Sequence, residues 1–214
     1  MKTWFTADTH FGHQRIIELC NRPFESVDDM NAALIENINA TVPKEDRLVI
    51  LGDICMGKLE DSLPLLAQIH AAELVLVPGN HDRWSLAYRH SGNAEKQNTR
   101  REEFRRRYQE AHDNSYALPD KGNKGWSYFD LTEEVAALDS PLDRATFSHY
   151  PYTGDSGHED RHANLRPADL GQPLVHGHVH GEWQTNEKQF NVGVDVNNYT
   201  PVSEDTLIQW MENL

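Results

Sequence analysis

Two pairs of metal-ligating side chains stand two positions apart, near the two ends of the sequence. Asp8 is followed by His10, and His178 is followed by His180. In an extended segment, side chains two positions apart lie on the same side, so each pair can reach one divalent ion. Carboxylate oxygens and imidazole nitrogens are ligands of transition metals. Each pair alone is a weak signal, since an Asp at such a position is often only a helix cap.

Three further candidate ligands follow other short apolar runs. Gly52 allows a close backbone turn before Asp53, whose two carboxylate oxygens can bridge two ions. Asn80 offers a neutral carbonyl oxygen, and His149 offers a third imidazole. Taken singly, a Gly-Asp step or an Asn commonly marks only a turn. Together with the two pairs, these residues predict a metal site.

Two residues directly after Asn80 are candidates for catalysis. His81 points away from the direction of Asn80 in an extended segment and can donate a proton or a hydrogen bond to a phosphoryl oxygen. Asp82 can accept the other imidazole N–H and fix the tautomer of His81. His81 is therefore a candidate for catalysis, and Asp82 is a candidate to orient it.

Short apolar runs precede all of these polar clusters. Runs of this length that are bounded by turn residues are typical of buried strands. In open α/β sheets, the loops at the carboxyl ends of the strands converge on one crevice, so we expect the clusters to meet there. The predicted strands are Thr3 to Ala7, Leu48 to Leu51, Leu74 to Val77, Ala145 to Phe147 and Leu174 to Val175.

Helical spacing of apolar residues occurs between and after these runs. It predicts one helix after Ser26 as N-cap, a second over Leu59 to Ile69, and a closing helix from Ser203. The polar segment Trp84 to Lys124 is typical of a solvated helix followed by a loop. The segment Tyr152 to Gln172 has no apolar periodicity. We expect these two segments to choose the substrate.

Length and composition restrict the class of protein. A chain of 214 residues suits a single domain, residues 1–214. With 20 Lys and Arg against 34 Asp and Glu, the net charge is −14, which disfavours general nucleic-acid binding. No apolar stretch reaches the roughly 20 residues of a membrane span. Only Cys20 and Cys55 are present and the chain opens without a secretory signal, so we expect a reduced, cytoplasmic protein. The oligomeric state stays open.

Residues that flank the motifs are candidates for substrate contacts. Guanidinium groups suit phosphate, and a histidine after the first motif can face the cleft. The candidates are His13, Asn21, Arg22, Arg83, Asp155 and Arg161.

The ordered set of motifs resembles the signature of the calcineurin-like metallophosphoesterases. That set is Asp8-x-His10, Gly52-Asp53, Gly79-Asn80-His81-Asp82, His149 and Gly177-His178-x-His180. Longer strings resemble a subgroup of small bacterial and phage-borne members. These strings are Asp8-Thr-His-Phe-Gly-His13, Cys20-Asn-Arg-Pro-Phe24, His149-Tyr-Pro-Tyr152 and Asn191-Val-Gly-Val-Asp195.

The resemblance implies an α/β fold, a four-layer αββα sandwich of two mixed β-sheets flanked by helices. It also implies two divalent metal ions, with Mn²⁺ favoured over Fe, Zn or Ni. The implied ligands are Asp8, His10 and His180 for the first ion, Asn80, His149 and His178 for the second, and Asp53 as the bridge.

The reaction implied by the resemblance is hydrolysis of a phosphomonoester or phosphodiester bond in a small, nucleotide-like substrate. Catalysis would use the dinuclear site and a bridging hydroxide, with His81 as acid. One alternative is a nuclease acting on DNA or RNA, or beside it a protein phosphatase. The acidic composition weighs against the nuclease. Another alternative is a non-catalytic metal-binding interaction module on the same fold, although a binding module has little reason to keep all seven ligands and His81.

Overall fold

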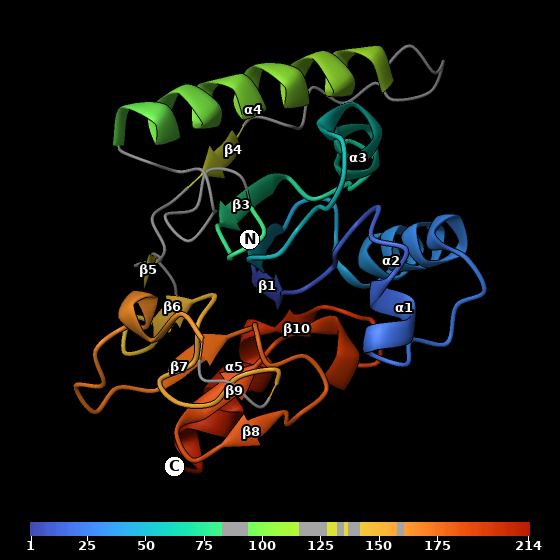
Figure 1. Ribbon diagram of the computed structural model, residues 1–214. Coiled ribbons are helices and arrows are strands. Elements are labelled where there is room, and N and C mark those ends of the chain that lie inside the picture. Colours follow the sequence, from blue (N-terminus) through green and yellow to red (C-terminus); the bar gives the residue numbers. More distant parts are fainter. Residues whose placement is uncertain (83–93, 116–127, 132–134, 137–141, 158–160) are drawn as a thin grey trace.

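Two five-stranded β-sheets pack against each other at the centre of the fold (Figure 1). The computed structural model describes residues 1–82, 94–115, 128–131, 135–136, 142–157 and 161–214. The first sheet contains strands from the N-terminal half of the chain and one strand near the C-terminus. The second sheet is built from residues 135–191.

The first sheet has the strand order β10-β1-β2-β3-β4. Strands β1 to β4 are parallel, and β10 pairs antiparallel with β1. The strands are β1 (Thr3–Thr6), β2 (Arg47–Leu51), β3 (Glu73–Val77), β4 (Tyr128–Leu131) and β10 (Val202–Ser203).

The second sheet has the order β5-β6-β7-β9-β8. Its three central strands are parallel, and its two edge strands are antiparallel to their neighbours. The strands are β5 (Val135–Ala136), β6 (Thr146–Ser148), β7 (Leu174–His176), β8 (Thr185–Asn186) and β9 (Gln189–Asn191).

Alternation along the strands of the first sheet separates two cores. Phe5 lies opposite Val49, and Val49 lies opposite Val75. These buried side chains belong to the core shared with the second sheet, where Phe5 stacks on Phe147 with 5.2 Å between ring centroids. Successive side chains of a strand point to opposite faces, so the buried neighbour Leu48 belongs to the other core, against the helices.

Helices α2, α3 and α4 cover that other face of the first sheet (Figure 1). Helix α5 contacts β10 and β1 and adds buried residues to the core between the sheets. The predicted fold class, an α/β sandwich of two mixed sheets with flanking helices, is confirmed. The α-helices are α1 (Ile16–Leu19), α2 (Val27–Thr41), α3 (Leu59–Leu66), α4 (Ala94–Ser115) and α5 (Glu204–Glu212), and the short 3₁₀ helices are η1 (Ala163–Leu165) and η2 (Val194–Val196).

All five predicted strands are present, and no bound differs from the predicted one by more than one residue. The predicted N-cap Ser26 is also present, and Ser203 caps the closing helix in the same way. Ser26 Oγ accepts a hydrogen bond from Asp29 N at 3.1 Å at the start of α2, and Ser203 Oγ accepts one from Thr206 N at 3.2 Å at the start of α5. Helix α3 begins at the predicted residue, contains Pro64 and ends at Leu66, three residues before the predicted end.

The predicted solvated helix is α4, but one stripe of it is not solvated. Phe104 and Tyr108 of α4 are buried in the core against the first sheet. The remainder is charged, with a salt bridge between Arg106 and Glu110 at 2.6 Å. Most of the loop predicted to follow lies outside the described residues. None of the helices in the described ranges is long and apolar enough to cross a membrane.

Candidate metal centre

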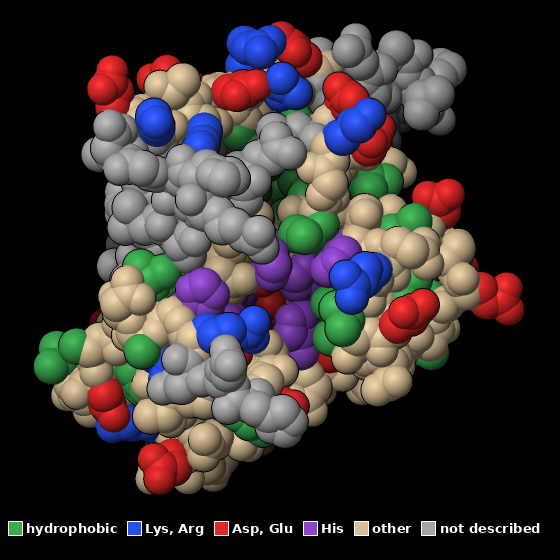
Figure 2. All heavy atoms as spheres, viewed as in Figure 1, with side chains coloured by type: hydrophobic (Ala, Val, Ile, Leu, Met, Phe, Trp, Pro, Cys, Tyr) green, Lys and Arg blue, Asp and Glu red, His purple; other side chains and the backbone are tan. Residues whose placement is uncertain are grey.

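The polar clusters meet at the carboxyl ends of strands from both sheets. Figure 2 shows histidine side chains gathered around a hollow near the middle of one face. The loops after β1 and β2 are joined directly, because Asp8 N donates to Gly52 O at 3.0 Å and His10 N donates to Asp53 O at 2.9 Å. Residues that are far apart in the sequence thus form one site.

Five of the seven predicted ligands have left-handed backbone conformations. Their φ angles are 56° for Asp8, 50° for His10, 51° for Asp53, 72° for His178 and 48° for His180. Non-glycine residues rarely adopt this region, and such residues cluster at functional sites, where the surrounding structure holds them. The backbone here is shaped to turn these side chains toward one space.

Two glycines allow the backbone to approach the ligands closely. A Cβ atom at Gly79 would lie 2.3 Å from Asp53 Oδ1 and 2.5 Å from Asp53 N. At Gly52, whose φ is +82°, a Cβ would lie 2.4 Å from His149 Nδ1. Any larger residue would displace a ligand, so both positions require glycine.

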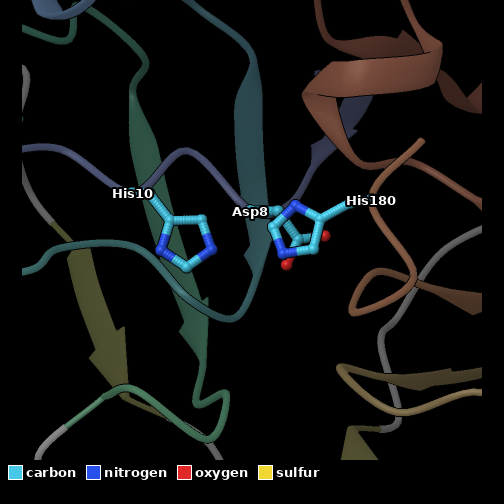
Figure 3. A group of neighbouring side chains, drawn as sticks. All are labelled: Asp8, His10 and His180. Atoms are coloured by element: carbon cyan, nitrogen blue, oxygen red, sulfur yellow. The ribbon is translucent and has the colours of Figure 1, made fainter. Parts of the chain in front are cut away.

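Asp8, His10 and His180 form the first ligand group, and their side chains point toward one shared space (Figure 3). One ligand atom from each lies within 4.8 Å of the others. Asp8 Oδ1 and His10 Nε2 are buried without a hydrogen-bond partner among the described residues. Buried polar atoms are rarely left unpaired, so a cation at this place fits the donor set.

His149, Asn80 and His178 form the second ligand group. His149 Nδ1 donates to Leu51 O at 2.9 Å, which leaves a lone pair on Nε2. That Nε2 atom lies 3.1 Å from Asn80 Oδ1 and 3.2 Å from His178 Nδ1. Acceptor atoms that face one another favour a cation between them, so this group also fits a metal ion.

Asp53 lies between the two groups. Its Oδ2 atom is 3.7 Å from His10 Nε2 and 3.6 Å from His149 Nε2. Burial by itself would raise the pKa of Asp53, but the imidazoles of His149, His81 and His10 hold it well below its usual value. An ionised carboxylate in this place is suited to bridge two cations.

Burial and charge set the protonation of the histidine ligands. Burial lowers the pKa of His10 well below its usual value, and burial together with His149 lowers the pKa of His178 to about 3. Both are therefore neutral, the form that binds metals. At His180, Asp8 and Asp195 outweigh burial and raise the pKa to about 11. A metal ion bound there must displace a proton.

Comparisons with known proteins agree with this geometry. The family model of calcineurin-like phosphoesterases matches residues 1–182. The chain belongs to this family. It is also 30% identical over 206 residues to the Gene 66 protein of Mycobacterium phage L5, covering 90% of this chain and 86% of that protein. The Gene 66 protein of Mycobacterium phage D29 is 30% identical over 203 residues, covering 90% and 87%.

A solved structure supports the fold over the whole length. The Aquifex aeolicus protein AQ665, of unknown function, superposes with a TM-score of 0.64 at 20% identity, covering 98% of each chain. Family membership makes this chain a phosphoesterase of the hydrolase class, and its structure contains candidate groups of metal ligands. The expected relationship to small phage-borne members is consistent with the phage relatives.

The phosphoesterase has a pocket of about 590 Å³ over the two ligand groups. Three predicted substrate contacts, His13, Asn21 and Arg161, line this pocket together with His81. The His81 side chain is 43% exposed, and its ring centroid lies 5.5 Å from that of His10. His81 is thus placed beside the ligands with its ring open to the pocket. Arg83, another predicted contact, lies outside the described residues.

The prediction that Arg22 contacts substrate is wrong. Arg22 is buried, and its guanidinium forms two hydrogen bonds to Asp195, of 2.8 and 2.9 Å. It also donates to the backbone oxygens of Thr9 and Asp8, at 3.1 and 2.7 Å. A guanidinium with these partners has no group left for a ligand in the pocket.

Asp82 has a different role from the predicted one. We expected it to accept a hydrogen bond from the His81 ring. In the described part of the chain, its buried carboxylate accepts instead from the backbone N–H groups of Asp53, Ile54 and Gly79, at 2.8, 3.1 and 2.8 Å. Burial and the charge of Asp53 raise the pKa of Asp82 to about 7. Asp82 therefore fixes the loop that carries Asp53 and does not orient His81.

Asp155 also lies behind the ligands and not among the pocket residues. Its side chain is buried, and its Oδ1 atom is 3.4 Å from His178 Nε2. Arg161 donates to it twice, from the backbone at 2.9 Å and from Nη2 at 2.8 Å. The predicted substrate contact at Asp155 is therefore wrong: its carboxylate orients a ligand.

Residues that the sequence reasoning assigned no role also contact the ligands. Asp195 Oδ2 lies 3.0 Å from His180 Nδ1, and the rings of Tyr150 and His162 pack against His178 with centroid distances of 5.4 and 5.9 Å. Cys20 has its sulfur within 4.8 Å of ligand atoms of His180 and Asp195. Asp195 could have been found, because it closes one of the strings shared with the phage-type subgroup.

Proposed function

We propose that this phosphoesterase hydrolyses a small, nucleotide-like phosphomonoester or phosphodiester with two divalent metal ions. The observation that carries the proposal is the place of Asp53 Oδ2, 3.7 Å from His10 in one ligand group and 3.6 Å from His149 in the other. A carboxylate between two sets of facing acceptors suits a pair of ions with a shared ligand.

The first ion would be held by Asp8, His10 and His180, and the second by Asn80, His149 and His178. Mixed oxygen and nitrogen ligands suit Mn²⁺, our first choice by family resemblance, and also Fe, Zn or Ni. When bound, two such ions neutralise charge on the phosphoryl oxygens and lower the pKa of a water molecule.

His81 would transfer a proton in this site. Its ring is open to the pocket, and its backbone N–H donates to Asp53 Oδ1 at 2.8 Å, which fixes it next to the bridging carboxylate. An imidazole within reach of the leaving oxygen can protonate it as the ester bond breaks. Arg161 and Asn21 would contact the phosphate or the group esterified to it.

The lining of the pocket favours a small substrate with an apolar or aromatic part. Ile16, Leu19 and Cys20 form one side, and Asn21 and Arg161 add polar groups. A pocket of about 590 Å³ accommodates a nucleotide-sized molecule. The net charge of −14 disfavours the long anionic backbone of DNA or RNA. Two free thiols, Cys20 and Cys55, suit the reducing cytoplasm, which we propose as the location.

A substrate panel tests this proposal. Metal-free protein is reconstituted with Mn²⁺, Zn²⁺ or Ni²⁺ and assayed on an aryl phosphomonoester, an aryl phosphodiester, cyclic nucleotides and oligonucleotides. Asn80→Ala, which removes a ligand of the second group, is the control. We expect hydrolysis of small esters, little of oligonucleotides, and loss in the control.

Two results would count against the proposal. Activity on the small esters that survives Asn80→Ala would contradict the assignment of the site. Preferred cleavage of oligonucleotides would replace the small-molecule substrate with a nucleic acid.

A further inference from the structure

Each histidine of the His178-x-His180 pair contacts a carboxylate that an arginine holds. His180 Nδ1 lies 3.0 Å from Asp195 Oδ2, and Asp195 is held by Arg22. His178 Nε2 lies 3.4 Å from Asp155 Oδ1, and Asp155 is held by Arg161. The chain thus contains two Asp–Arg pairs, one behind each ligand group.

The Asp195–Arg22 pair is buried and bidentate. The side chains are 3% and 0% exposed, and the two parallel hydrogen bonds measure 2.8 and 2.9 Å. This fork fixes both oxygens of Asp195 in a plane, so the direction of the His180 ring is also fixed. With the proton of His180 on Nδ1, its Nε2 atom keeps a lone pair for a metal ion.

Arg22 also holds the loop that carries the other two residues of the first ligand group. It donates to Asp8 O at 2.7 Å and to Thr9 O at 3.1 Å. These carbonyls belong to the loop in which Asp8 and His10 have φ angles of 56° and 50°. Non-glycine residues rarely adopt this conformation, so this loop needs fixed partners.

The Asp155–Arg161 pair provides a natural comparison. Arg161 has a side chain that is 50% exposed, and only its Nη2 atom donates to Asp155 from the guanidinium. The Asp155–Arg161 pair contacts the second ligand group through His178. Within the described residues, it forms no hydrogen bond or ion pair with the loop of Asp8 and His10. A change at Asp155 should therefore leave the first group unaffected.

We propose that Asp195 and Arg22 are positioning residues of the first metal site, acting through His180 and the loop of Asp8 and His10. The inference rests on the proposed dinuclear function. In the aspartate, Oδ1 accepts from Arg22, and Oδ2 faces both Arg22 and His180 Nδ1. An amide at position 195 replaces one of these two oxygens with an NH₂ group that cannot accept. Either the arginine loses its fork, or an N–H group faces His180 Nδ1 and drives its proton to the metal-binding nitrogen.

Isothermal titration with Mn²⁺ tests the proposal in an Asn80→Ala background, where only the first site should keep its ion. Adding Asp195→Asn should weaken binding of this ion about 10–100-fold, the usual effect of losing a partner of a metal-bound histidine. Adding Asp155→Asn, the matched control, should leave it unchanged. Thermal unfolding of the metal-free variants shows whether each is folded.

Asp195→Asn leaves Arg22 buried beside a neutral amide, which can prevent folding. A second variant, Arg22→Lys, covers this case. Arg22→Lys keeps the buried cation next to Asp195 but cannot bind Asp8 O and Thr9 O at the same time as both oxygens of Asp195. Arg22→Lys should weaken binding of the same ion, and by less than Asp195→Asn does. Unchanged affinity in the folded variants, or an equal loss with Asp155→Asn, would overturn the positioning role.

The wild-type titration separates this inference from the proposed function. Two ions bound by the wild type with no effect of Asp195→Asn would refute only the positioning role. A wild-type chain that binds no Mn²⁺, Zn²⁺ or Ni²⁺ would refute the dinuclear proposal and the inference with it.

Discussion

The candidate metal ligands could be identified at the level of single residues, because their types and spacing carry the chemistry. Asp8 and His10, like His178 and His180, are two apart after a strand, and the structure brings both pairs to one site. Their partners could not be predicted in this way. The sequence does not distinguish an arginine that is open to a pocket from one that is buried against a carboxylate. Only the fold shows that Arg22 is buried.

Replacing His81 tests its role in proton transfer. His81→Ala should keep both metal ions, because the ring lies outside the two ligand groups, and should lower kcat about 100- to 10,000-fold. Metal content by plasma emission spectroscopy and turnover of an aryl phosphodiester check this. Unchanged turnover in a variant with two bound ions would rule His81 out as the acid.

Replacing Gly79 tests the close approach at the bridging carboxylate. Gly79→Ala places a methyl group 2.3 Å from Asp53 Oδ1, so Asp53 must move and metal binding should fall together with activity. Gly181→Ala is the matched control, since a Cβ at Gly181 meets no atom within 4 Å. Equal metal affinity in the two variants would show that the packing at Gly79 is unimportant for the site.

Strands with strong apolar runs were predicted, and a strand rich in polar residues was not. Strand β9 was missed because two of its three residues are amides. Gln189 Oε1 accepts from Tyr152 N at 2.6 Å, and Asn191 Nδ2 donates to His180 O at 2.9 Å. These buried polar residues fix loops near the site. Their hydrogen bonds connect residues distant in sequence, so no local pattern reveals them.

The N-cap of α2 should contribute to stability and not to the site. Ser26→Ala removes the hydrogen bond from Asp29 N and should lower the free energy of unfolding by about 0.5–2 kcal/mol. Urea denaturation measures this change, and Mn²⁺ titration should give the wild-type affinity. A loss of metal affinity would show that α2 is coupled to the site, contrary to this account.

At the scale of the whole molecule, the site depends on two sheets whose contact no local pattern determines. The interface is apolar, as at Phe5 and Phe147, and the ligands stand at the strand ends beside it. The position of the polar clusters at the ends of predicted strands was enough to predict that the clusters would meet. The arrangement as two mixed sheets came from the family resemblance, because apolar periodicity is the same for one sheet or two. The two segments expected to choose the substrate are described only in part. Their described residues are 94–115, 152–157 and 161–172.

The pH dependence of the free energy of unfolding should show that His176 is buried in its neutral form. Burial lowers the pKa of His176 to about 3, from an ordinary value of 6.5. As the pH falls below about 6.5, the unfolded chain binds a proton that the folded chain does not, so the free energy of unfolding decreases until about pH 3. The packing of the His176 ring against Trp183, with 4.7 Å between centroids, allows His176→Phe as a comparison.

The difference in stability between the wild type and His176→Phe isolates the effect of His176, because the other histidines titrate in both proteins. Thermal unfolding of the metal-free wild type and of His176→Phe is measured between pH 7 and 4. As the pH falls, the unfolding temperature of the wild type should decrease more than that of the variant. Parallel curves over this range would mean that His176 is not buried in its neutral form.

The most direct measurement of the central claim is a stepwise Mn²⁺ titration of metal-free protein, in which bound ions and hydrolysis of an aryl phosphodiester are followed together. The account predicts two ions per chain, full activity only when both are bound, and loss of activity in Asp53→Asn, because Asp53 Oδ2 lies between the two ligand groups. Full hydrolysis by metal-free protein, or by Asp53→Asn, would contradict it.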